Sequence, residues 1–217
     1  MTNMARDTQS FIADLVDDLA PVSPLTVRSG VALTTSVLLL TMVTVALFGG
    51  IRADLSAGHV DPIFLLSAGL FLLLGCATSL TVVTMSRPQI GSDHSGWKWA
   101  IATVALLPVT AMVMMMLRDQ LAATASSVDH DLGCLAAGSI LGLLTASGLT
   151  LLLRRGAPTS PGQAGLLTGI AAGSFGIFSF SFYCDINDIV HIGIWHCLVI
   201  VVGGLVGRLL VPRLIRW

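Results

Sequence analysis

The chain has 217 residues, of which 54% are hydrophobic and 11% are charged, whereas a soluble domain has about 25% charged residues. A water-soluble globule of this size could not bury so much apolar surface, so the composition excludes an ordinary soluble fold. The alternative solvent is a lipid bilayer, which one helix crosses with about 20 mostly apolar residues. The formal net charge of −1 gives no indication of direct nucleic-acid binding.

Residues 1–26 form a short tail before the first apolar run. The tail carries four aspartates, lacks an early apolar core and ends in Pro21 and Pro24, so it is not a secretory signal. Apolar residues at i, i+1, i+4, i+5 and i+8 predict an amphipathic helix of about three turns. They are Phe11, Ile12, Leu15, Val16 and Leu19, and the opposite face carries Asp14, Asp17 and Asp18. Ser10 or Thr8 could cap its start, and the prolines end it.

This tail helix is expected to form against another surface, because an isolated helix so short is marginal in water. Helices that lie on a membrane surface usually carry Lys and Arg, whereas this one is acidic. A basic protein with a groove is therefore the expected partner, bound by helix-in-groove recognition. The alternative is a tail that folds back on the cytoplasmic loops of its own chain.

Six apolar runs follow the tail, each long enough to cross a bilayer. They are approximately residues 27–50, 63–84, 99–117, 132–153, 163–183 and 191–211. The sequence thus predicts an all-α fold, in which residues 27–217 form one bundle of six transmembrane helices with short loops. No internal repeat supports a transporter built from inverted repeats.

The basic residues predict the orientation of this bundle. With loops on alternating sides, nine of the eleven Lys and Arg residues share a side with both termini, and only Arg52 and Arg118 lie opposite. Because positive charge favours the cytoplasmic side, both ends are expected in the cytoplasm. In a bacterium this would be the inner membrane.

The fourth and fifth predicted helices are joined by a tight turn after Arg154 and form an antiparallel hairpin. Cys134 opens the fourth helix and Cys184 closes the fifth, 20 residues before Arg154 and 21 after Gln163. At 1.5 Å per residue both thiols rise about 30 Å and reach the outer surface together.

Small residues would allow the two helices of this hairpin to pack closely. Gly138 and Gly142 make one GxxxG pattern on the fourth helix, and Gly165, Gly169 and Gly173 make a doubled one on the fifth. Such faces let membrane helices approach closely, although the pattern is common. We expect the two helices to pack through these glycines.

The four cysteines form no CxxC motif. Cys76 and Cys197 lie within apolar runs and are most simply packing residues. Cys134 and Cys184 could form a fixed disulfide, act as a redox-responsive pair or remain unpaired. With nearby histidines they could also ligate a soft metal, through His130, Cys134, Cys184 and His191. The alternative is an ordinary solvated loop, and no cofactor is expected.

These residues carry a family resemblance. The stretch from Asp131 to Trp217 resembles the negative regulator of sigma F (NrsF) family, membrane anti-sigma factors of proteobacteria. The matching pieces are Asp131-Leu132-Gly133-Cys134-Leu135, Arg154-Arg155-Gly156-Ala157-Pro158 with Pro161 and Ala164-Gly165, Cys184 with Trp195, and Gly207-Arg208 leading to Arg216-Trp217. The tail's Leu19-Ala20-Pro21-Val22 with Pro24-Leu25 looks like the family's N-terminal element.

The resemblance implies a cytoplasmic tail that holds an extracytoplasmic-function sigma factor at the membrane. It also implies that Cys134 and Cys184 sense oxidative or heavy-metal stress and cause release of the sigma factor. In the family a histidine often precedes the second cysteine, whereas Tyr183 precedes Cys184 here. If that histidine tunes the thiol or binds metal, His191 or His196 would have to substitute.

The leading hypothesis is therefore a non-enzymatic sensor that regulates transcription. A membrane thiol oxidoreductase is an alternative, but it normally has a reactive close pair of cysteines and a route to quinone. A small transporter is another, but it normally has ionisable residues at mid-bilayer, and the six runs carry none away from their ends.

Overall fold

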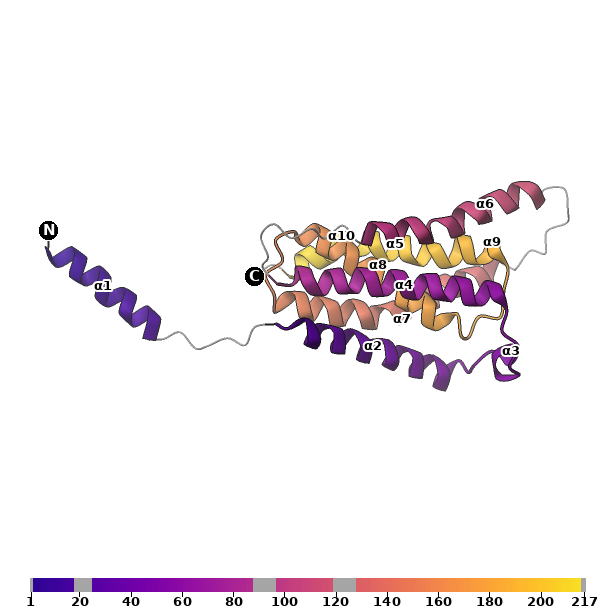
Figure 1. Cartoon of the computed structure of the whole chain (residues 1–217), viewed down its shortest axis with the longest axis horizontal. Coiled ribbons are helices and arrows are strands. Elements are labelled where there is room, and N and C mark those ends of the chain that lie inside the picture. The colour runs from indigo at the N-terminus through magenta and orange to yellow at the C-terminus, as the bar shows by residue number, and fades with distance from the viewer. Residues whose placement is uncertain (1, 18–24, 88–96, 119–127, 216–217) are drawn as a thin grey trace.

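The computed structural model describes residues 2–17, 25–87, 97–118 and 128–215, and every regular element among them is a helix (Figure 1). Five helical segments in this part of the chain are long and apolar enough to cross a membrane. They are α2 (Val27–Phe48), α4 (Pro62–Met85), α7 (Val128–Arg154), α8 (Pro161–Phe180), and a continuous segment of α9 (Ile189–His191), the π-helix η1 (Ile192–His196) and α10 (Cys197–Leu214). Five of the six predicted runs thus correspond to these segments.

The remaining predicted run is divided into α5 (Trp97–Val104) and α6 (Leu106–Arg118). The division falls at Ala105, three residues before Pro108, which has no N–H to donate and crowds the preceding turn. Hydrogen bonds still cross the division, from Ala105 N to Ile101 O at 2.8 Å and from Val109 N to Ala105 O at 3.3 Å. Neither piece alone reaches the length of a crossing, so the expected count of six is not established.

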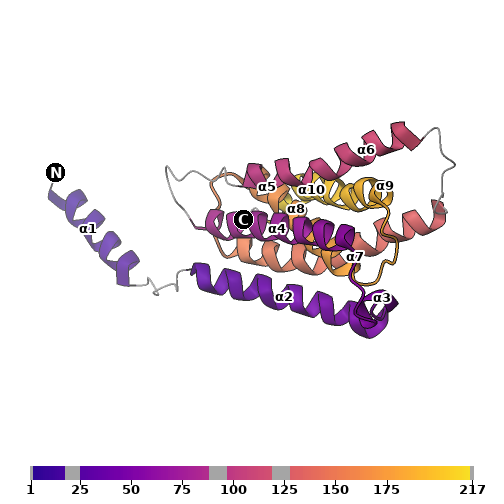
Figure 2. The same ribbon diagram turned by 45° about the vertical axis from the view of Figure 1, so that its right-hand side comes forward.

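Helix α8 is the centre of the bundle. About 89% of its most apolar window is buried, against 17% for α2, the most peripheral of the five segments. It packs against α10, α7 and α4, which surround it in Figure 1. Helix α2 lies along α7 at the edge of the bundle, as Figure 2 also shows.

Glycines let the backbones around α8 approach closely, but not with the partner predicted. A Cβ added at Gly165 would collide with the carbonyl of Gly207 on α10, and one at Gly169 with the carbonyl of Gly203. The GxxxG face of α8 therefore meets α10, and the expectation that it meets α7 is wrong. Helix α7 does present its Gly142 to α8, against Ala172. The spacing identifies a close-packing face, but it does not say which helix lies against it.

The two ends of the bundle differ in what they contain. The start of α2 and the end of α10 share one end, and the short helix α3 (Ala53–Ser56) lies with α9 at the other (Figure 1). The tail forms α1 (Thr2–Asp17), which Figure 1 shows apart from the bundle. Because α1 begins at Thr2, Thr8 and Ser10 lie inside it, and the prediction that either caps its start is wrong.

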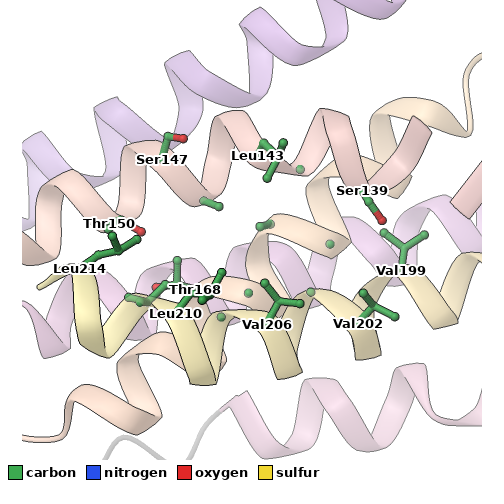
Figure 3. Close-up of a pocket in the computed structure, with 18 of the residues that line it drawn as sticks. Ser139, Leu143, Ser147, Thr150, Thr168, Val199, Val202, Val206, Leu210 and Leu214 are labelled. Carbon is green, nitrogen blue, oxygen red and sulfur yellow. The ribbon is translucent and has the colours of Figure 1, made fainter. Parts of the chain in front are cut away.

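A groove of about 470 Å³ runs between α7, α8 and α10 (Figure 3). Leu143, Val202, Val206 and Leu210 give it an apolar wall. Arg154 is the one titratable residue among those that line it. The groove therefore offers a surface for apolar chains but no set of groups for chemistry.

Candidate functional site

The two cysteines predicted as a pair lie at the end of the bundle opposite the start of α2. Cys134 is in the second turn of α7, and Cys184 is in the 181–188 loop because α8 ends at Phe180, short of the predicted Tyr183. The Cys184 N–H donates to Phe180 O at 3.0 Å, which turns the chain back over the helix end. Both are free thiols, only 2% and 4% exposed. The expected shared height is therefore found, but the expected surface position is not.

Two histidines complete a compact cluster with these thiols. One donor atom from each of Cys134, Cys184, His191 and His196 lies within 4.8 Å of every other. We call these four residues the Cys–His cluster. The predicted metal set contained His130 in place of His196, but His130 is exposed and its ring lies 6.1 Å from that of His191. His130 is therefore a neighbour of the Cys–His cluster and not a member.

The π-helix η1 explains how His191 and His196 reach the same site. In an α-helix residues advance about 100° each, so side chains five apart diverge by about 140°. The i→i+5 hydrogen bonding of a π-helix widens the turn and brings such residues toward one side. Here η1 begins directly after His191 and ends at His196, and their ring centroids are 5.1 Å apart.

A buried carboxylate orients His191. His191 Nδ1 lies 2.7 Å from Asp131 Oδ1, and Asp131 is only 5% exposed. An Nδ1–H that donates to this carboxylate leaves the lone pair on Nε2, which lies 3.8 Å from Cys184 Sγ. The His191 backbone N–H also donates to Asp188 Oδ2 at 3.3 Å, at the start of α9. Asp131 and Asp188 thus hold the imidazole toward the thiol.

The Cys184 thiol is placed to ionise easily. Its pKa lies below the usual value because the Cys134 thiol interacts with it by a hydrogen bond, and because His191 and His196 lie beside it. The thiolate is the form of cysteine that attacks oxidants and binds metals. The arrangement therefore suits either disulfide formation or metal ligation at Cys184.

His196 is buried without the hydrogen bonds that a buried imidazole needs. It is 2% exposed, and neither ring nitrogen has a hydrogen-bond partner within the described part of the chain. Its ring rests near those of Phe71 and Phe180, at centroid distances of 6.2 and 6.4 Å. An unsatisfied buried polar group costs about 1–3 kcal/mol, so a ligand at His196 would remove a real penalty.

Arg52 is a component of the site that the sequence did not single out. Its side chain is buried, and Nη1 donates to the Cys184 carbonyl at 2.8 Å. Nε and Nη2 donate to both oxygens of Asp54 at 2.7 and 2.6 Å, which holds the pKa of that carboxyl below its usual value. The Arg52 N–H also donates to Phe182 O at 3.1 Å. Arg52 therefore fastens the 181–188 loop to the segment between α2 and α4.

A polar cavity of about 520 Å³ gives access to the Cys–His cluster. Cys184 and His130 border it, together with Arg52, Asp54 and Asp185. Its wall contains several charged residues, whereas Arg154 is the one charged residue that lines the groove in Figure 3. A small ion or oxidant could approach Cys184 from this side.

The other residues singled out from the sequence lie elsewhere. On α1, the side chains of Phe11, Ile12, Leu15 and Val16 are between 53% and 63% exposed. Asp14 and Asp17 are also exposed. Asp18 and Leu19 lie outside the described residues. Of the remaining cysteines, Cys197 is buried as expected for packing, whereas Cys76 is exposed on α4.

Comparison with known proteins agrees with the resemblance noted in the sequence. The chain is 29% identical over 170 residues to the anti-sigma-F factor NrsF of Caulobacter vibrioides, covering 76% of this chain and 78% of the relative. It is 24% identical over 167 residues to a probable anti-sigma-F factor NrsF of Azospira oryzae, covering 77% and 78%. No solved structure matches the chain. The family model of the negative regulator of sigma F matches residues 15–217, and the chain therefore belongs to this NrsF family.

Proposed function

We propose that the protein is a membrane-bound anti-sigma factor, which holds an extracytoplasmic-function sigma factor inactive and releases it under oxidative or heavy-metal stress. The role is regulatory and not enzymatic, in line with the names of the relatives from Caulobacter vibrioides and Azospira oryzae. The observation that carries the sensing part is the buried pairing of Cys134 with Cys184 beside two histidines. The membrane is the bacterial inner membrane.

The proposed topology has six crossings, with α5 and α6 together making the third. They span residues 97–118, and hydrogen bonds continue across the division at Ala105. A kinked helix of this length is sufficient for a bilayer. Both ends of the chain then lie in the cytoplasm, and the Cys–His cluster lies at the outer side, where oxidising conditions permit a disulfide.

The proposed docking element is α1. Four large apolar side chains on a helix, each more than half exposed, are unfavourable in water and gain free energy when a groove covers them. The sigma factor would bind Phe11, Ile12, Leu15 and Val16, together with Leu19. Asp14, Asp17 and Asp18 would face basic residues at the rim of that groove.

The proposed signal is the formation of a disulfide between Cys134 and Cys184. An oxidant of the peroxide class takes two electrons and two protons from the two thiols, and the Sγ atoms, which lie within 4.8 Å of each other, move to about 2.0 Å as the disulfide forms. Because Cys184 is in a loop and Cys134 on α7, this displaces the 181–188 loop relative to α7. The tight packing of α8 on α10 carries the displacement along the bundle. The two arrangements must differ in affinity for the sigma factor.

The deciding experiment purifies the full chain from membranes with its sigma factor, with and without reductant. Reduced protein retains the sigma factor, and oxidised protein loses it. A Cys134→Ser, Cys184→Ser double variant retains it in both conditions, while Cys76→Ser behaves like the parent. Release from the double variant on oxidation would overturn sensing by this pair. Reduction of quinone by the purified protein would favour a thiol oxidoreductase instead.

A further inference from the structure

We propose that the Cys–His cluster is a four-coordinate site for a soft divalent cation of the Zn²⁺ class. Two thiolates and two imidazoles are the ligand set of many tetrahedral zinc sites. The proposal concerns metal binding alone and stands or falls independently of any sigma factor.

The spacing of the donor atoms supports tetrahedral coordination. Zn–S and Zn–N bonds of about 2.3 and 2.0 Å at a tetrahedral angle separate S from N by about 3.5 Å. Cys184 Sγ and His191 Nε2 are 3.8 Å apart, and all four donors lie within 4.8 Å of one another. The Cys184–His191 pair would have to contract by about 0.3 Å, and any other sulfur–nitrogen pair by at most about 1.3 Å, to close the shell around one ion.

Asp131 gives His191 the orientation of a metal ligand. Metal-bound histidines usually donate their other ring N–H to a carboxylate or carbonyl, which fixes the tautomer and strengthens the ligand. His191 Nδ1 is 2.7 Å from Asp131 Oδ1 while Nε2 faces Cys184. Asp131 is therefore a positioning residue for the site.

The burial of His196 without hydrogen-bond partners among the described residues is the independent observation that points to a ligand. His196 is 2% exposed, lies among the other three donors, and has no hydrogen-bond partner for either nitrogen among the described residues. A histidine retained only for packing would not need the π-helix that brings it beside His191. Coordination explains both its burial and the local helix distortion.

Charge balance fits the buried position. Binding of a divalent cation displaces one proton from each thiol to solvent, and both imidazoles bind in their neutral form. Two thiolates then cancel the charge of the cation, so the ion and its four ligands are together neutral, and the Asp131 carboxylate beside His191 carries the remaining charge. The polar cavity beside Cys184 supplies an entrance for the ion and an exit for the protons.

Cobalt is the probe for the test, because Co²⁺ occupies zinc sites and reports thiolate ligation by its absorption. The full chain, reduced and stripped of metal in detergent, should bind one Co²⁺ per chain. Thiolate-to-cobalt charge transfer and strong visible bands of tetrahedral cobalt should appear, and Zn²⁺ should abolish both. Bound Zn²⁺ should also slow alkylation of Cys134 and Cys184.

The most informative variant removes one of the four proposed ligands. His196→Ala should weaken Co²⁺ binding by more than about 100-fold, because even second-shell changes cost about 10–100-fold. The matched controls are His59→Ala and Cys76→Ser, which alter an exposed histidine and an exposed cysteine away from the site. Both should bind Co²⁺ as the parent does. His130→Ala should also bind nearly normally, which distinguishes this ligand set from one containing His130.

Two outcomes would overturn the proposal. One is reduced, folded protein that shows no charge-transfer band with Co²⁺. The other is His196→Ala that binds Co²⁺ as tightly as the parent. If His196→Ala does not fold, His196→Cys decides the matter, since a third thiolate should restore binding and intensify the charge-transfer band. An unchanged spectrum in that variant would exclude His196 from the site.

Discussion

The two histidines of the Cys–His cluster and the apolar face of helix α1 reverse the usual pattern of burial in opposite ways. In the cluster, side chains that carry polar or ionisable groups are at most 4% exposed, whereas on α1 four large apolar side chains are more than half exposed. Each arrangement costs free energy unless a partner relieves it: a ligand or bond for the first, an apolar surface for the second. In the proposed function these are two separate roles, one that receives a signal and one that binds a protein. Variants should therefore affect one region without the other.

The largest expected effect comes from removing α1. A chain lacking residues 1–17 should bind the sigma factor about 1,000-fold more weakly, because four apolar side chains lose roughly 1 kcal/mol or more each. Titration calorimetry with the purified sigma factor measures the loss. The same variant should keep parental Co²⁺ affinity. Loss of Co²⁺ binding would show that the two regions are not separate.

Asp131→Asn should leave the protein folded and weaken Co²⁺ binding by about 10–100-fold, because an amide orients and polarises His191 less well. Competition with a chelator of known affinity measures the change. Asp188→Asn, which alters the weaker 3.3 Å contact to the His191 backbone, should have a smaller effect. Sigma-factor affinity of reduced, metal-free Asp131→Asn should match that of the parent.

The packing of α8 on α10, which is the proposed route for the displacement along the bundle, can be weakened at Gly169. Gly169→Ala places a methyl group against the Gly203 carbonyl and should lower the free energy of unfolding by about 1–3 kcal/mol. Thermal unfolding in detergent measures this. The matched control is Gly69→Ala on α4, where an added Cβ meets nothing within 4 Å. That variant should be neutral or slightly stabilised.

Arg52→Lys should have the smallest effect. Lysine keeps the positive charge but cannot bind both Asp54 oxygens and the Cys184 carbonyl together. The 181–188 loop should become more mobile, and alkylation of Cys184 in metal-free protein should be a few-fold faster. Mass spectrometry of labelled peptides reads this directly, with Cys134 as the internal reference. An unchanged alkylation rate would show that Arg52 does not restrain the loop that carries Cys184.

The sequence allows the helices to be predicted well because lipid leaves few alternatives: long apolar runs must be helical. It also places Cys134 and Cys184 at one height, since both distances follow from helix rise. His196 was named only as an alternative to His191, and their joint presence in the cluster could not be predicted, because an α-helical count sets them apart and the π-helix brings them together. The role of Arg52 in the site was missed because its hydrogen bond to Cys184 reaches across 132 positions in the chain. The partner of the α8 glycines was mistaken because spacing defines a face but not its neighbour.

The π-helix has a mechanical consequence for the C-terminal segment. If η1 returned to α-helical winding, α10 would turn by about 100° and shift by about 1.5 Å relative to His191. His196 would leave the cluster, and Gly203 and Gly207 would turn away from α8, where their backbones now fit. The winding of five residues thus sets the angular register of a whole helix. A single residue deleted within 192–195 would compensate this shift: the segment could wind as an α-helix, with α10 still in register against α8.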